Sequence, residues 1–64
     1  MLIAVKNINN ETFYLNTLQI ASIEKDSDTG NAIVEMVGGA IYPLNESFDS
    51  LIAKITNTTD TTNQ

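Results

Sequence analysis

The sequence predicts a mainly β fold, either a small curled antiparallel sheet or an SH3-like barrel of about five strands with one C-terminal helix. Two observations predict it. Short segments rich in aliphatic, β-branched and aromatic residues are separated by clusters of Asn, Asp and Gly, as strands are separated by turns. Near the C-terminus, the apolar residues instead recur at the three- and four-residue spacing of a helix.

The predicted strands are short, and their order follows the turn signals between them. They cover residues 1–6, 12–15, 20–25, 32–37 and 40–44. Residues 1–6 carry apolar side chains on both alternating sides, so we expect this strand to be buried on two faces. Residues 7–10 form a turn, because Asn tolerates left-handed backbone angles. A short helix over residues 18–24 is the alternative to the third strand.

Residues 26–31 predict a hairpin turn between the third and fourth strands. Alternating oxygen-bearing side chains also suggest a calcium loop, which is the alternative. The match to an EF-hand loop is poor, because Gly30 falls at the fifth place and Val37 stands where the bidentate Glu belongs.

Gly38 and Gly39 predict a tight two-residue hairpin, since both can adopt positive φ. The register that follows pairs Val37 with Ala40, Met36 with Ile41, Glu35 with Tyr42, Val34 with Pro43 and Ile33 with Leu44. One face of this hairpin then offers Val34, Met36 and Ile41, and the other offers Ile33, Val37 and Leu44.

One helix can cover only one face of so small a sheet. The second face is therefore either the inside of a barrel or an interface with another protein or another copy. As an interface, its binding residues are predicted to be Ile33, Glu35, Val37, Tyr42 and Leu44.

The C-terminal helix is predicted over residues 47–55, with Asn45 or Ser47 as its N-cap. Its apolar stripe consists of Phe48, Leu51, Ile52 and Ile55. The two central residues, Leu51 and Ile52, are expected to be buried against the sheet. Residues 1–55 form a single domain, and residues 56–64 have no apolar side chain, which predicts a disordered polar tail.

The composition predicts a protein that is not an enzyme. The chain has no arginine, histidine, cysteine or tryptophan, so the usual nucleophile-base pairs and the ligands of structural zinc are missing. We therefore expect no catalytic residues, no metal site and no cofactor. A domain this small commonly needs a partner subunit for stability, which predicts a homo-oligomer.

The net charge of −5 disfavours direct binding to nucleic acid or to anionic membranes. Residues 2–5 are too few for a signal-peptide core or a membrane span, and no basic stretch precedes them, so we expect a cytoplasmic protein.

The spaced residues of the chain resemble the small bacterial FlbD-type flagellar proteins. The matching positions are Leu15-Asn16, Ile20, Ile23-Glu24, Asp28-Thr29, Ile33-Val34, Gly39, Tyr42, Glu46-Ser47 and the helix stripe. The resemblance implies a non-enzymatic accessory factor in flagellar or motility function. The chain departs from the family at Asn9-Asn10, where an Asn-Gly turn is usual, and in its Thr- and Asn-rich tail. Residues 20–51 are more loosely similar to LytTR DNA-binding domains, but the chain lacks the arginines expected of a DNA reader.

Three functions follow from these observations. The first is a self-associating, non-catalytic protein-interaction or accessory module, FlbD-like in type. The second is a small acidic inhibitor or nucleic-acid mimic of the kind that phages use against a host protein, which the net charge suggests. The third is a protein that binds a small ligand between subunits.

Overall fold

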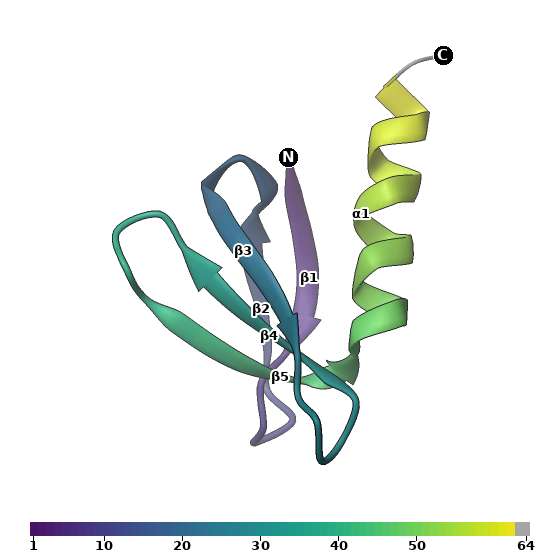
Figure 1. Ribbon diagram of the computed structural model, residues 1–64. Helices are drawn as coiled ribbons and strands as arrows, with labels where there is room; N and C mark the ends of the chain where they lie inside the picture. The colour runs from purple at the N-terminus through teal and green to yellow at the C-terminus, as the bar shows by residue number, and fades with distance from the viewer. Residues whose placement is uncertain (63–64) are drawn as a thin grey trace.

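Figure 1 shows the computed structural model, which describes the backbone of residues 1–62 and the side chains of residues 1–57. Within residues 1–62 the chain forms five strands, one 3-10 turn and one α-helix, which confirms the mainly β fold. The elements are β1 (Leu2–Lys6), β2 (Thr12–Asn16), η1 (Thr17–Gln19), β3 (Ile20–Lys25), β4 (Asn31–Met36), β5 (Ile41–Ser47) and α1 (Phe48–Thr62).

The strands form two antiparallel sheets, β1-β2 and β3-β4-β5. A single bridge between Asn7 and Leu44 connects the end of β1 to β5. Through this bridge the strands follow the order β2-β1-β5-β4-β3, and the ribbon curls without closing, because β2 and β3 at its two ends are not paired within residues 1–62. The curled sheet is therefore the fold, and the closed barrel is not.

The local signals in the first half of the chain are confirmed. The Asn7 carboxamide oxygen accepts hydrogen bonds from the backbone N–H of Asn9 and Glu11, and Asn10 has a φ of 66°. Asn16 then accepts from the N–H of Leu18 at 3.0 Å and caps η1. The third strand forms as predicted, in place of the alternative helix over residues 18–24.

The turn at residues 26–30 is a hairpin turn, as predicted. The Asp26 side chain accepts from the N–H groups of Asp28 (2.8 Å) and Thr29 (3.4 Å), and the N–H of Gly30 donates to the carbonyl of Asp26. The Asp26 carboxylate thus holds the loop through backbone donors.

The predicted register of the β4-β5 hairpin is wrong by one residue. The loop contains Val37 as well as the two glycines, because the N–H of Val37 leaves the ladder and donates to the carbonyl of Gln19 at 2.7 Å. Gly38 and Gly39 both have a φ near 100°, as expected of this turn. Ile33 therefore lies opposite Pro43, Val34 opposite Tyr42 and Glu35 opposite Ile41. A one-residue slip turns every side chain of one strand to the other face.

The core lies between the two sheets and is closed by α1. Its buried members among the described residues are Ile3, Val5, Leu15, Ala32, Val34, Leu44 and Leu51. The first strand was expected to be buried on both faces, and this is wrong: Leu2 and Ala4 are exposed. They point away from the core because side chains alternate along a strand and Ile3 and Val5 face inward, and α1 packs on the other sheet and leaves this outer side uncovered.

The helix begins after Ser47, whose hydroxyl accepts from the N–H of Ser50 at 3.1 Å, so Ser47 is the predicted cap. Leu51 is fully buried as predicted. Ile52 is 37% exposed, so its predicted burial is wrong, since the packed side of α1 is narrower than the stripe. The helix continues to Thr62, beyond the predicted end at Ile55. The order of the tail in solution stays a prediction, and residues 63–64 lie outside the described residues.

Candidate interaction surfaces

The five residues predicted as an interface do not form one surface. Leu44 is 1% exposed and belongs to the core. Tyr42 points to the same inner side, where its ring lies 5.5 Å from that of Phe13. Val37 is exposed in the hairpin loop. Ile33 and Glu35 share the outer side of β4, and the one-residue slip explains why Leu44 is not beside them.

The outer side of the β3-β4-β5 sheet is a surface that we call the acidic face. Its residues are Ser22, Glu24, Ile33, Glu35, Ile41 and Pro43. Ile41 is 60% exposed and lies beside the half-buried Ile33 on the diagonal of the β4-β5 pair. Glu24 and Glu35 are exposed around them. The slip placed Ile41 on this surface, where the sequence-based register had put Leu44.

The outer side of the β1-β2 sheet is a second surface, which we call the basic face. Its residues are Leu2, Ala4, Lys6, Thr12 and Tyr14, all exposed. Leu2 is 63% and Tyr14 is 65% exposed, and they lie on a cross-strand diagonal that an aromatic side chain can span. Sequence reasoning missed this surface by assigning both sides of the first strand to the core. The sequence did contain a signal for it: the one predicted helix could not also cover the outer side of a second sheet.

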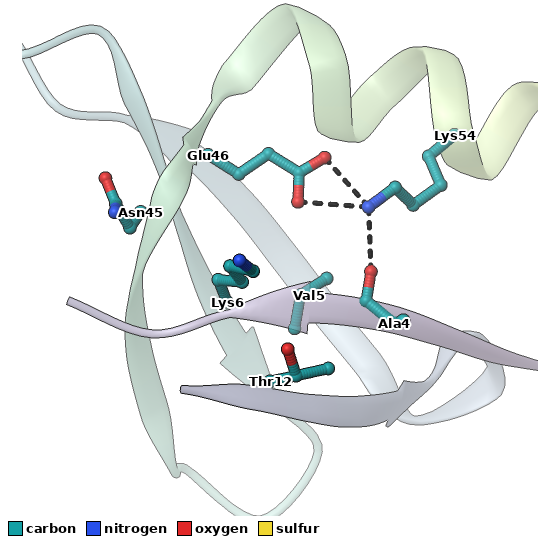
Figure 2. Close-up of a pocket in the computed structure, with 7 residues that line it drawn as sticks. All are labelled: Ala4, Val5, Lys6, Thr12, Asn45, Glu46 and Lys54. Carbon is teal, nitrogen blue, oxygen red and sulfur yellow. Dashed lines mark hydrogen bonds and ion pairs between the residues drawn. The ribbon is translucent and has the colours of Figure 1, made fainter. Parts of the chain in front are cut away.

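A polar cluster joins α1 to the strands at the border of the basic face. Figure 2 shows the ammonium group of Lys54 between the Glu46 carboxylate, with N–O distances of 3.0 and 3.1 Å, and the carbonyl of Ala4 at 2.7 Å. Glu46 is only 13% exposed, and its carboxylate also accepts from the Ser50 hydroxyl at 2.9 Å. Lys54 thus binds a carbonyl on the edge of β1, where a strand partner would otherwise donate.

Lys54 was not predicted to contact the strands. Its position three residues after Leu51, on the border of the apolar stripe, was the signal for a contact with the sheet.

An open cavity of about 280 Å³ lies beside this cluster. It is lined by Ala4, Val5, Lys6, Thr12, Asn45, Glu46 and Lys54 (Figure 2). Two of the three lysines of the chain line it, and Glu46 compensates Lys54 directly. The cluster therefore acts as a connection between α1, β1 and β5, and Lys6 supplies the positive charge of the adjoining surface.

The described residues contain no group of three or more Asp, Glu, His or Cys side chains able to hold a metal ion. Within the part of the chain that the structure describes, no helix is both long and apolar enough to cross a membrane.

Residues 2–62 match the family model named FlbD, which is described as flagellar and swarming motility proteins. The chain belongs to the FlbD family. This match covers both sheets and α1, and it confirms the resemblance suggested by the spaced turn and apolar residues. No curated protein and no solved structure matches the chain. Membership makes this a protein of the flagellar and swarming motility class.

Proposed function

We propose that this FlbD-family protein is a non-catalytic accessory module of flagellar or swarming motility, and that it works by associating with itself and with another protein. The observation that carries the binding part of this proposal is the pair of outer faces. Each sheet has one side in the core and presents exposed apolar residues on the other, Leu2 and Tyr14 on the first sheet and Ile41 on the second.

Single exposed apolar side chains are common on soluble proteins and need no explanation. Here they occur beside other apolar residues on the outer sides of the two sheets, next to charged residues. Such a surface, with an aromatic or aliphatic centre and a polar rim, has the composition of a protein-protein interface. The small size of the domain supports the same proposal, because association adds buried area that a chain of 64 residues lacks.

Two experiments test the two parts separately. Deleting the gene in its own host should reduce swarm expansion, and the full chain supplied from a plasmid should restore it. Unchanged swimming and swarming after deletion would refute the motility role. For self-association, sedimentation velocity at tens of micromolar should give species larger than one chain, and a strict monomer throughout would refute it.

A further inference from the structure

The two outer faces are complementary in charge. Lys6 is the charged residue of the basic face, whereas Glu24 and Glu35 are the charged residues of the acidic face. Each face also has an exposed apolar pair or centre beside its charges. We propose that the basic face of one copy binds the acidic face of the next, so that the chains associate head to tail; this inference rests on the proposed self-association.

The other two lysines do not add positive charge to the acidic face. Lys54 is paired with Glu46. Lys25 lies opposite Ala32, on the other side of the sheet from Glu24 and Glu35. In a chain with a net charge of −5, the basic face is therefore a local exception.

The nearest carboxylate to the basic face in sequence is that of Glu11, which accepts a hydrogen bond from the Asn7 carboxamide at 3.0 Å. This bond holds Glu11 at the turn between β1 and β2, beyond the end of the face. Glu46, which lines the same cavity as Lys6, is paired with Lys54. Among residues 1–57 Lys6 forms no salt bridge, so it can meet the carboxylates of another molecule.

Charge also argues against pairing each face with its own copy. Two basic faces in contact would bring Lys6 near Lys6, and two acidic faces would bring two pairs of glutamates together. Like charges across an interface disfavour that partner, whereas opposite charges both attract and set the register. The head-to-tail arrangement is the one that pairs Lys6 with Glu24 or Glu35 and Tyr14 with Ile41.

The fold determines what such a contact builds. The core lies between the two sheets, so their outer faces point away from each other. A copy that binds through its basic face still has its acidic face available for the next copy. A heterologous contact of this kind forms a ring if the rotation closes, or an open filament if it does not.

Mixing two variants tests this geometry. Tyr14→Glu places a carboxylate in the basic face, and Ile41→Glu places one in the apolar centre of the acidic face. Both side chains are mostly exposed, at 65% and 60%, so both variants should keep the fold, which circular dichroism verifies. Ile8→Glu is the matched control, because Ile8 is 67% exposed but lies in the β1-β2 turn outside both faces.

In sedimentation velocity, wild type and Ile8→Glu should form oligomers that grow with concentration, and each face variant alone should stay monomeric. An equimolar mixture of Tyr14→Glu and Ile41→Glu should form a heterodimer and grow no further. One intact acidic face and one intact basic face then meet, and the two remaining faces are blocked. A mixture that stays monomeric would overturn the head-to-tail arrangement, and variants that assemble like wild type would overturn the choice of faces.

A charge pair gives a second test if either of these variants fails to fold. Lys6→Glu and Glu35→Lys should each weaken assembly, by roughly tenfold in apparent association constant for one repelling contact. Their mixture should regain extended assembly, because both kinds of contact in it join opposite charges. No recovery on mixing would refute the electrostatic pairing.

The outcomes separate the two proposals. A wild-type protein that is strictly monomeric would overturn both the head-to-tail contact and the proposed self-association. Wild-type oligomers that neither variant pair disturbs would overturn this inference alone and leave self-association standing.

Discussion

Replacing Leu51 by alanine removes the one fully buried side chain that α1 contributes to the core among residues 1–57. Truncation of a buried leucine costs about 2–5 kcal/mol, because the lost transfer free energy is joined by the cost of a cavity. A domain of 64 residues has a total unfolding free energy of only about 3–10 kcal/mol at the usual stability per residue. The variant should therefore be unfolded or close to unfolding.

The neighbouring position provides a matched control. Ile52 is on the same turn of α1 but is 37% exposed, so Ile52→Ala removes less buried area and should cost about 1 kcal/mol or less. The two variants shorten adjacent aliphatic side chains by similar amounts. A large difference between their losses of unfolding free energy would therefore report the effect of burial and not of helix propensity.

Urea unfolding followed by circular dichroism at 222 nm measures both variants. The protein concentration must be fixed, because an associating protein gains apparent stability with concentration. In thermal unfolding at the same wavelength, about 4–8 °C per kcal/mol applies to a domain of this size, so Leu51→Ala should lower the melting temperature by at least about 8 °C. Equal stability of the two variants would show that α1 does not close the core.

Three further substitutions test the local structure, each by its urea midpoint. Lys54→Met should lower the free energy of unfolding by about 1–3 kcal/mol, because it leaves the mostly buried Glu46 carboxylate uncompensated. The control Lys25→Met changes an exposed lysine and should be nearly neutral. Equal effects of the two substitutions would show that the cluster does not connect α1 to the strands. Ser47→Ala should cost about 1 kcal/mol through the lost helix cap, and an unchanged midpoint would exclude that role. Gly38→Ala should cost about 1–2 kcal/mol through backbone strain alone, since φ is +101° and a Cβ there would meet no atom within 4 Å; a neutral result would place the glycine in another conformation.

Most of the secondary structure could be predicted from the sequence because its signals are local. Asn10 at positive φ, Ser47 as a cap and the Asp26 turn all depend on side chains acting within a few residues. Strand residues between such turns have few other conformations available. These elements are where the predictions are confirmed.

The register of the β4-β5 hairpin could not be predicted in the same way. Two glycines permit a loop of two or three residues, and the choice depends on the bond from Val37 to Gln19, which are 18 positions apart in sequence. That distant contact moved Leu44 into the core and Ile41 onto the acidic face. The predicted interface therefore retained Ile33 and Glu35 but lost its apolar centre.

The basic face was missed for a related reason. Apolar residues on both sides of a strand indicate either double burial or an uncovered face, and the pattern alone does not separate them. The decision depends on where α1 packs, which the helix stripe does not specify. Leu2 and Ala4 are thus the residues that the folded arrangement turns from expected core into surface.

The central claim is that this FlbD-family protein acts in motility through its two outer faces, and swarm expansion of a deletion strain tests it most directly. The strain would express wild type, the double variant Tyr14→Glu/Ile41→Glu, or the control Ile8→Glu, at equal protein levels measured by immunoblot. Wild type and the control should restore swarming, and the double variant should not, although it is folded. Full restoration by a folded, strictly monomeric double variant would contradict the account.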